Sequence, residues 1–264
     1  MTADRRVLAE RLAREAGQIA RDYFRRATVE HKLNNEIVTQ ADRAVQAHLS
    51  DTIRRELPGD GFIGEEAERG ELFKEKADAE HCWVVDPIDG TNNFAAGMPL
   101  FAVSIAVLRS GAPELGIVYD PLRDELYQAE RGRGAWRGGQ RLQVAAADAD
   151  SNSLVGLPSV FRPGVPPYVV RWAEKHKGRM LGSIALHLAY VAAGSFHWTV
   201  AYRTKIWDVA AGALLVEEAG GRVTDLAGKP LFPVDLTAEQ GGLFPILASN
   251  GALHEARLRD IAGD

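Results

Sequence analysis

The chain has 264 residues, of which 46% are hydrophobic and 25% are charged, and its formal net charge is −5. These values are typical of a globular protein with one large domain or two closely packed ones. The negative charge offers no overall basic field for nucleic acid, and no apolar run approaches the roughly 20 residues of a membrane span. We therefore expect neither a nucleic-acid partner nor a membrane-bound protein.

The single cysteine and the N-terminal sequence indicate a compartment. Cys82 has no partner for an intrachain disulfide, which fits a reducing environment. The opening residues, MTADRRVLAERLARE, lack the apolar core of a signal peptide. The sequence therefore predicts a cytoplasmic protein.

The first half of the chain predicts two amphipathic helices and a strand meander. Apolar residues recur at helical spacing in residues 4–26 and again in residues 44–57, where a Pro-Gly pair ends the second helix. Residues 62–66 predict a short strand that ends on two glutamates. The acidic segment 67–80 is expected to form a surface loop or a short helix. Glycine turns then separate further strands, which begin with FAVSIAVLR at residues 101–109.

The second half alternates strands with helices and follows a small, polar segment at residues 145–153. That segment predicts a boundary between an N-terminal α+β half, residues 1–147, and a C-terminal α/β half, residues 148–264. Helices are expected at residues 167–177, 183–194 and 207–221. Strand meanders combined with paired helices favour a layered α/β or α+β sandwich.

The segment WVVDPIDGTNNF, residues 83–94, places two acids after a buried strand. Asp86 is expected at the end of that strand, where Pro87 cannot donate to a ladder and bends the chain out of the sheet. Asp89 can then turn back toward Asp86. Two carboxylates this close repel each other unless a cation lies between them or one is protonated. Oxygen ligands without histidine or thiolate favour magnesium or manganese over zinc.

Further features point from a metal site to phosphate chemistry. Gly90 lets the backbone approach a ligand closely, and a helix that starts at Thr91 would present free amides to an anion. Glu65, after the preceding strand, and Asp208, placed at the N-cap of a helix of small residues, add two more acids. Each feature alone could be structural, as a turn, a solvated loop or a helix cap. Together they favour a metal-dependent reaction on phosphate.

Three motifs carry a resemblance to a known family. They are GEE at residues 64–66, DPIDGTNNF at residues 86–94 and WDVAAG at residues 207–212. In order and spacing they resemble the inositol monophosphatase family, and the resemblance extends over nearly the whole chain. It implies a layered αβαβα sandwich of the sugar-phosphatase type. It also implies a magnesium-dependent, lithium-sensitive phosphomonoesterase that is usually a homodimer.

The resemblance implies roles for five residues around the metal. By matching position, one magnesium ion would be held by Glu65, Asp86 and the Ile88 carbonyl. A second ion would be held by Asp86, Asp89 and Asp208. Glu65 would share a third, weaker ion, so two or three Mg²⁺ ions are expected, and Mn²⁺ is expected to substitute.

The charges of such a site leave a surplus that needs a further cation. Four carboxylates balance two divalent ions, so a bound phosphate dianion leaves about two negative charges uncompensated. This surplus gives a reason for a third ion or for a nearby cation such as Lys32.

The resemblance also implies how water and phosphate are handled. Thr91, together with Glu65, would orient the attacking water, and Asp42 is expected beside this catalytic group. The backbone amides of Gly90 and Thr91 would hold phosphate oxygens. No serine, cysteine or histidine stands in a recognisable triad, so water is the expected nucleophile.

The substrate is less clearly specified. Inositol-selective members of the family commonly carry an acid seven positions before the WD aspartate, where this chain has Ala201, a departure that argues against inositol selectivity. Arg203 could pair with a second phosphate, which would favour fructose 1,6-bisphosphate or 3′-phosphoadenosine 5′-phosphate, or it could be an ordinary surface residue. Gly182, Ser183 and Ile184 match the family's substrate-side turn, although Ser183 could equally be only a helix cap. Histidinol phosphate and a broad range of sugar phosphates stay open.

Two other classes of function compete with this interpretation. A nuclease can use a similar carboxylate cluster, but the sequence shows no basic groove. A regulatory binding protein on a phosphatase fold is the second alternative. The chain retains all four metal carboxylates and Thr91, which favours preserved catalysis. The sequence therefore predicts magnesium-dependent hydrolysis of a small phosphate monoester, either inositol monophosphate or a related sugar phosphate, with a bisphosphate as the alternative substrate.

Overall fold

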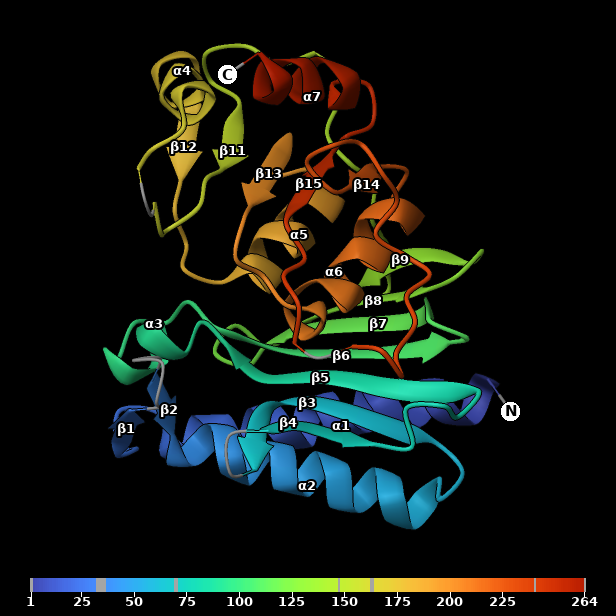
Figure 1. Cartoon of the computed structure of the whole chain (residues 1–264). Helices are drawn as coiled ribbons and strands as arrows, with labels where there is room; N and C mark the ends of the chain where they lie inside the picture. Colours follow the sequence, from blue (N-terminus) through green and yellow to red (C-terminus); the bar gives the residue numbers. More distant parts are fainter. Residues whose placement is uncertain are drawn as a thin grey trace.

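Two β-sheets, stacked with helices between them and on both outer sides, make up the structure (Figure 1). The computed structural model describes residues 2–31, 37–68, 71–146, 148–161, 164–239 and 241–263. Within these residues the helices are α1 (Thr2–Tyr23), α2 (Gln40–Glu56), α3 (Thr91–Ala95), α4 (Pro167–Lys175), α5 (Ile184–Ala192), α6 (Ile206–Glu218) and α7 (His254–Ala262).

The larger sheet comes from the first half of the chain. Its strands are β3 (Gly61–Glu68), β4 (Glu71–Glu75), β5 (His81–Asp89), β6 (Ala102–Arg109), β7 (Ala112–Asp120), β8 (Glu125–Glu130), β9 (Gly134–Arg137) and β10 (Gln140–Arg141). They are arranged in the order β10-β9-β8-β7-β6-β5-β3-β4. Neighbouring strands are antiparallel except for β3 and β5, which run parallel.

The smaller sheet comes from the second half. Its strands are β11 (Leu154–Gly156), β12 (Lys177–Arg179), β13 (Trp198–Ala201), β14 (Arg222–Thr224) and β15 (Ile246–Ser249), in the order β12-β11-β13-β15-β14. Strand β11 is parallel to β12 and β13, and the other pairs are antiparallel. A separate antiparallel pair, β1 (Val29–His31) and β2 (Ile37–Thr39), precedes α2.

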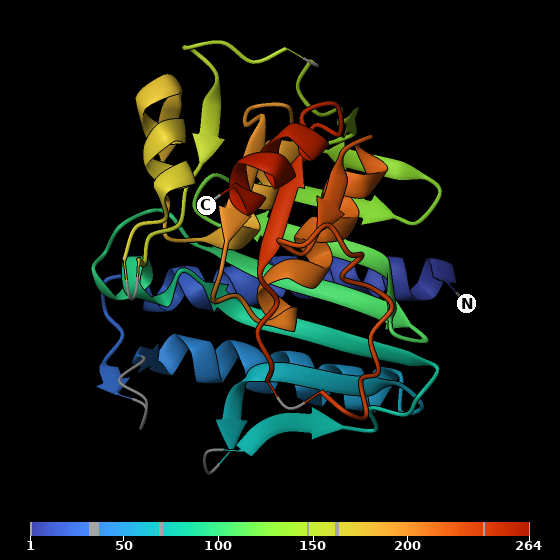
Figure 2. The same cartoon turned by 45° about the horizontal axis from the view of Figure 1, so that its top comes forward.

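The layers follow the expected αβαβα order. Helices α1 and α2 cover one face of the larger sheet, and α5 and α6 lie between the two sheets (Figures 1 and 2). Helices α4 and α7 cover the outer side of the smaller sheet. The predicted fold class, a layered sandwich of the sugar-phosphatase type, is confirmed.

Side chains of the central strands point alternately to the two faces of the sheet, and both faces are covered by helices, so these strands are apolar throughout. On β5, Trp83 and Val85 pack into the core beneath α1 and α2, whereas Cys82 and Val84 pack into the core around α5 and α6. Successive strand residues point to opposite faces, and helices cover both faces here, so every position of β5 is buried.

The small residues of α6 are explained by close packing on two sides. A Cβ atom added at Gly116 of β7 would lie 2.7 Å from the backbone oxygen of Ala211. A Cβ added at Gly212 would lie 2.5 Å from the Cβ of Leu188 on α5. The WDVAAG motif therefore lets α6 sit tightly between the larger sheet and α5.

Three local expectations were wrong. The segment expected to be a loop or short helix contains β4, because it pairs with β3 and its Phe73 packs edge-on against Phe62 at 5.5 Å, which outweighs its acidic composition. Strand β3 does not end at Glu66 but continues to Glu68. Strand β5 continues past Asp86 to Asp89, with a register shift opposite β6 where Pro87 interrupts the ladder.

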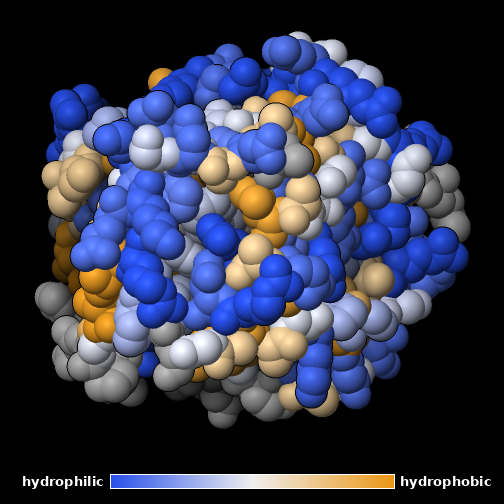
Figure 3. Space-filling view, turned by 90° about the horizontal axis from the view of Figure 1, so that it is seen from above, coloured by the Kyte–Doolittle hydropathy of each residue, from blue (hydrophilic) through white to orange (hydrophobic). Residues whose placement is uncertain are grey.

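The features that can be compared with those of a membrane-spanning protein are the helices and the outer face. In the described part of the chain, no helix has both the length and the apolar character needed to cross a bilayer. The side on which α4 and α7 lie is mostly hydrophilic, with scattered apolar areas (Figure 3). The proposed division after residue 147 stays a prediction, and Ala147 itself and Lys32 lie outside the described residues.

Candidate metal centre

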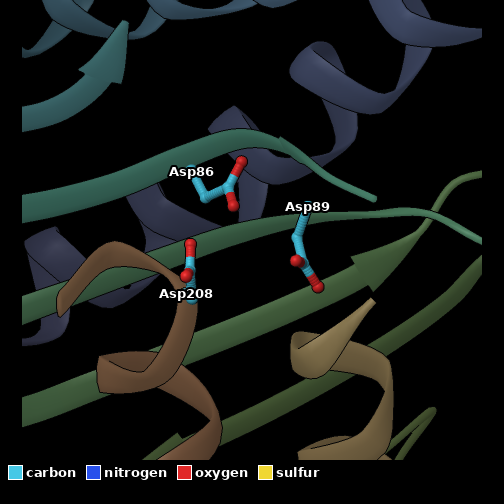
Figure 4. A group of neighbouring side chains, drawn as sticks. All are labelled: Asp86, Asp89 and Asp208. Atoms are coloured by element: carbon cyan, nitrogen blue, oxygen red, sulfur yellow. The ribbon is translucent and has the colours of Figure 1, made fainter. Parts of the chain in front are cut away.

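The carboxylates of three aspartates from two elements lie close together (Figure 4). Asp86 and Asp89 lie at the end of β5, and Asp208 lies in the first turn of α6. Each offers a carboxylate oxygen, and these oxygens all lie within 4.8 Å of one another. Asp86 is only 1% exposed and Asp89 only 7% exposed, so little solvent screens their charges.

The environment opposes ionisation of this cluster. Burial raises the pKa of Asp86 well above its usual value, and the negative charges of Glu65, Asp89 and Asp208 raise it further. Burial and the charges of Asp89 and Glu65 raise the pKa of Asp208 in the same way. A divalent cation would compensate this repulsion, so the donor set fits a hard metal ion such as Mg²⁺.

Asp89 is partly compensated by hydrogen bonds from the second half of the chain. Burial raises its pKa to about 6, while donors from Ser183 and the Ala185 amide lower it. The Ser183 hydroxyl donates to Asp89 Oδ2 at 2.5 Å, and the Ala185 amide donates to the same oxygen at 2.6 Å. Ser183 is also the N-cap of α5, because its Oγ accepts from the Leu186 amide. Both interpretations of Ser183, a cap and a part of the cleft, therefore apply.

The GEE motif presents Glu65 to the same site. A Cβ at Gly64 would lie 2.3 Å from Gln46 Oε1, so glycine leaves room for the Gln46 amide. That amide accepts from Glu66 N at 2.8 Å and donates to Glu66 O at 2.6 Å. Glu65 lies between these fixed neighbours and lines the cleft that contains the aspartates.

The turn after β5 is held by local hydrogen bonds. The Ile88 amide donates to Asp86 Oδ1 at 2.9 Å, and the Thr91 hydroxyl donates to the Ile88 carbonyl at 3.0 Å. Gly90 has φ +98°, and a Cβ there would lie 2.9 Å from the Leu100 carbonyl oxygen, so this position requires glycine. The helix expected to open at Thr91 is present as α3.

Asp42 lies behind the cleft rather than in its lining. Its Oδ2 accepts from the backbone and the hydroxyl of Thr39, at 2.8 and 2.5 Å, and its Oδ1 is 3.4 Å from the Thr91 hydroxyl. The pKa of Asp42 is raised to about 6, mainly by burial. Hydrogen bonds from Thr39 lower this pKa, and the negative charge of Glu65 raises it further. The hydrogen bond to Thr91 therefore connects Asp42 to the site.

Asp208 is not the N-cap of α6, contrary to the expectation. The N-cap is Lys205, and Asp208 is the third residue of the helix. Its Oδ2 accepts from the Lys205 amide at 2.7 Å. An acid in the first turn satisfies an amide that has no partner within the helix, so the same composition fits either position. The bond also directs the Asp208 carboxylate toward the cluster.

A cleft of about 360 Å³ brings the other predicted residues together. It is lined by Glu65, Asp86, Ile88, Asp89, Gly90, Thr91, Gly182, Ser183, Ile184, Ala201, Arg203 and Asp208. The residues that were predicted to bind metal and those that were predicted to bind substrate therefore line the same cleft.

Two residues that fix the substrate-side turn were missed. Asn93 Nδ2 donates to the Leu181 carbonyl at 2.7 Å, and the Leu181 amide donates to His187 Nε2 at 3.1 Å. Since Nε2 accepts, Nδ1 carries the proton and donates to Thr199 Oγ1 at 2.9 Å. Burial lowers the pKa of His187 to about 4, so it stays neutral near pH 7. Asn93 stands in a motif, but no sequence signal marks His187.

The fold and the acidic cleft together define a layered α/β protein with a buried carboxylate cluster that fits a divalent cation. The sequence model of the inositol monophosphatase family matches residues 3–262. The chain therefore belongs to the inositol monophosphatase family.

Individual relatives agree with this assignment. The chain is 44% identical over 230 residues to Nus factor SuhB of Escherichia coli strain K12, covering 84% of this chain and 85% of that protein. It is 41% identical over 225 residues to an inositol-1-monophosphatase of Mesorhizobium japonicum, covering 82% and 83%. Among solved structures, an IMPase of Thermotoga maritima superposes with a TM-score of 0.85 at 32% identity, covering 98% of this chain and 97% of that one.

Repulsion within the cluster predicts a pH-dependent gain in stability when one carboxylate is neutralised. A carboxyl with a raised folded-state pKa stabilises the fold below its unfolded pKa, and this contribution is lost as pH rises through the folded value, here about 6 for Asp89. In metal-free protein near pH 8, Asp86→Asn should therefore raise the free energy of unfolding. The asparagine oxygen can still accept from the Ile88 amide.

Thermal unfolding in a chelator, compared near pH 5 and near pH 8, measures this effect. The gain should shrink at the lower pH, and added Mg²⁺ should stabilise the wild type more than the variant. The exposed Asp78→Asn serves as the control. An equal gain from Asp78→Asn, or no dependence on pH, would contradict repulsion as the cause.

Proposed function

We propose that this protein hydrolyses a small phosphate monoester, using water activated by bound magnesium. The observation that carries the proposal is the convergence of Glu65, Asp86, Asp89 and Asp208 on one cleft, where burial and mutual repulsion raise the pKa of the aspartates. Membership of the inositol monophosphatase family supports it.

All the metal ligands proposed from matching positions line one cleft, which supports the assignment. Glu65, Asp86 and the Ile88 carbonyl would hold one ion, and Asp86, Asp89 and Asp208 a second. The Ile88 carbonyl accepts from Thr91 but keeps a second lone pair for a metal. Bound divalent ions would make the attacking water more acidic and neutralise charge on the phosphate. Manganese, a similar oxygen-binding ion, should substitute.

Thr91 and Glu65 are proposed to orient the attacking water. The Thr91 hydroxyl donates its single proton toward the Ile88 carbonyl or Asp42, so its lone pairs are free to accept from water. The carboxylate of Glu65 can accept the water's other proton. Asp42, whose Oδ1 accepts from the Thr91 hydroxyl, would act as a positioning residue. The first amides of α3, at Gly90 and Thr91, would bind phosphate oxygens.

The choice of phosphate ester is the finer part of the proposal. Inositol monophosphate or a related sugar phosphate is the first candidate, and a bisphosphate is the alternative. Arg203 favours the alternative because it is exposed, lines the cleft and forms no hydrogen bond or ion pair with any other described residue. A guanidinium group free in this way suits a second phosphate. At Ala201, the side chain offers no oxygen to a ring hydroxyl.

The proposal also includes a homodimer, a cytoplasmic location and inhibition by lithium. A homodimer fits the exposed edge of β12, beside which Met180 is 55% exposed and Val170 of α4 is 44% exposed. Cys82 is buried and forms no disulfide among the described residues, in keeping with a cytoplasmic location. We also propose inhibition by lithium, as the family resemblance implies.

A regulatory role is a second candidate, because the chain is 44% identical to a protein named Nus factor SuhB. Such a role would not depend on catalysis. The experiment is copurification of RNA polymerase with wild-type protein and with the inactive variant Asp89→Asn. Equal recovery with both proteins would support a separate binding function, and no recovery with either would remove it.

Phosphate release in the presence of magnesium tests the catalytic proposal directly. The substrates should include inositol 1-phosphate, fructose 1,6-bisphosphate, 3′-phosphoadenosine 5′-phosphate, NADP and histidinol phosphate, each with and without lithium. Turnover of at least one substrate that disappears in a chelator is expected. The proposal fails if none is hydrolysed by protein that binds magnesium.

Glu65→Gln should lower kcat by about 10²–10⁴-fold because the variant loses the carboxylate that accepts the water's proton. Binding of phosphate should change much less, since Glu65 is not proposed to contact it. Steady-state kinetics and inhibition by inorganic phosphate provide the two measurements. A parallel loss of turnover and phosphate affinity would argue against a water-orienting role.

Arg203→Gln should discriminate between substrates that differ by one phosphate. The value of kcat/KM should fall roughly tenfold for fructose 1,6-bisphosphate, equivalent to about 1.4 kcal/mol, and hardly change for fructose 1-phosphate. Arg259→Gln on α7, also an exposed arginine, is the matched control. If both substrates lose the same factor, Arg203 does not recognise a second phosphate.

A further inference from the structure

One segment of the second half reaches across to the edge of the larger sheet. It lies between β14 and β15 and is described over residues 231–239 and 241–244; we call these residues the strap (Figure 2). The Val234 amide donates to the Gly111 carbonyl at 3.0 Å, and Leu236 is buried in the core between the sheets. Phe232 stacks on Phe244 with ring centres 6.4 Å apart. The strap is therefore an ordered part of the fold.

Lys74 of β4 binds the strap with its ammonium group. Its Nζ donates to the carbonyls of Leu236, Thr237 and Glu239 at 3.2, 2.8 and 3.0 Å. An ammonium has three donors, so one short run of backbone satisfies all of them. These carbonyls lie more than 160 positions further along the chain, so Lys74 forms a long-range tie between the two halves.

The other end of the strap contacts the residues just before Asp208. Lys205 Nζ donates to the Gly241 carbonyl, and the Phe244 amide donates to the Thr204 carbonyl at 2.7 Å. The Lys205 amide in turn donates to Asp208 Oδ2 at 2.7 Å. The strap thus fixes the backbone that orients the Asp208 carboxylate.

The anchor of the strap also lies close to Glu65. In the pairing of β3 with β4, Lys74 stands opposite Ile63, two residues before Glu65. Contacts on both sides of residue 240, which lies outside the described residues, therefore connect the strap to the strand that carries Glu65 and to the helix that carries Asp208. We propose that Lys74 is a positioning residue that sets the separation of these two acids through the strap.

This inference rests on the proposed metal site but concerns ion binding rather than turnover. Loss of the tie would let the start of α6 move away from β3, because the Lys205 ammonium and the Thr204 carbonyl would lose partners that the strap holds in place. Residues that orient metal ligands typically change metal affinity by 10–100-fold when they are altered. The effect should therefore appear in metal affinity.

The test is calorimetric titration of full-length protein with Mg²⁺ and Mn²⁺. Lys74→Met should weaken ion binding about tenfold, whereas Lys74→Arg, which keeps a charged donor group, should restore most of it. Lys76→Met is the matched control, because Lys76 lies on the same hairpin but binds the Pro58 carbonyl instead of the strap. Hydrogen exchange should speed up in residues 203–208 of Lys74→Met only.

Combining variants separates transmission through the strap from a general loss of stability. In a Lys205→Met background, Lys74→Met should cause no further loss of affinity, since the route is already broken. Fully additive losses would overturn the inference, as would lower thermal stability with unchanged metal affinity. Should Lys74→Met not fold, Lys74→Gln takes its place under the same criteria. A wild type that binds no ion would instead refute the proposed function.

Discussion

Mutual repulsion among buried carboxylates is the interaction on which the architecture of the site depends. Asp86, Asp89 and Asp208 lie within a few ångströms of one another and are held there by hydrogen bonds from backbone amides and one serine hydroxyl. These donors soften the repulsion without removing it, because the pKa of each aspartate stays above its usual value. The two halves of the chain supply opposite sides of the cluster. Their contacts, from the turn at Ser183 to the strap, therefore hold together groups that would otherwise separate.

Much of the site could be predicted from the sequence because its acids occupy short motifs. The turn at residues 86–91 could be predicted because Pro87 interrupts the ladder of hydrogen bonds and Gly90 permits the turn. Strand β4 could not be predicted, because its pairing with β3 matters more than its acidic composition. Asp208 was expected to be the N-cap of α6 but is the third residue of the helix. The sequence could not distinguish these positions, because an acid is equally suited to the cap and to the first turn. The contacts of Lys74 and His187 had no local signal, since their partners are brought close only by the fold.

The lining of the cleft contains both bonded and exposed polar groups. Several of its polar side chains already bond within the protein: Ser183 to Asp89, Thr204 to the Phe244 carbonyl, and His187 to Thr199. Arg203 is exposed and lines the same cleft. Under the proposed function, its guanidinium group would suit an anionic group of the substrate.

The close packing of α6 has a consequence for how this scaffold can change. Helix α6 is confined by β7 on one side and α5 on the other, with no space for an added methyl group at Gly116 or Gly212. Enlarging either residue would shift the whole helix and, with it, the Asp208 carboxylate. Arg203 and Val160, by contrast, line the cleft but are exposed to solvent, so their replacement would not displace α6. Protein engineering aimed at new phosphate esters should therefore diversify the rim and leave the glycines around α6 untouched.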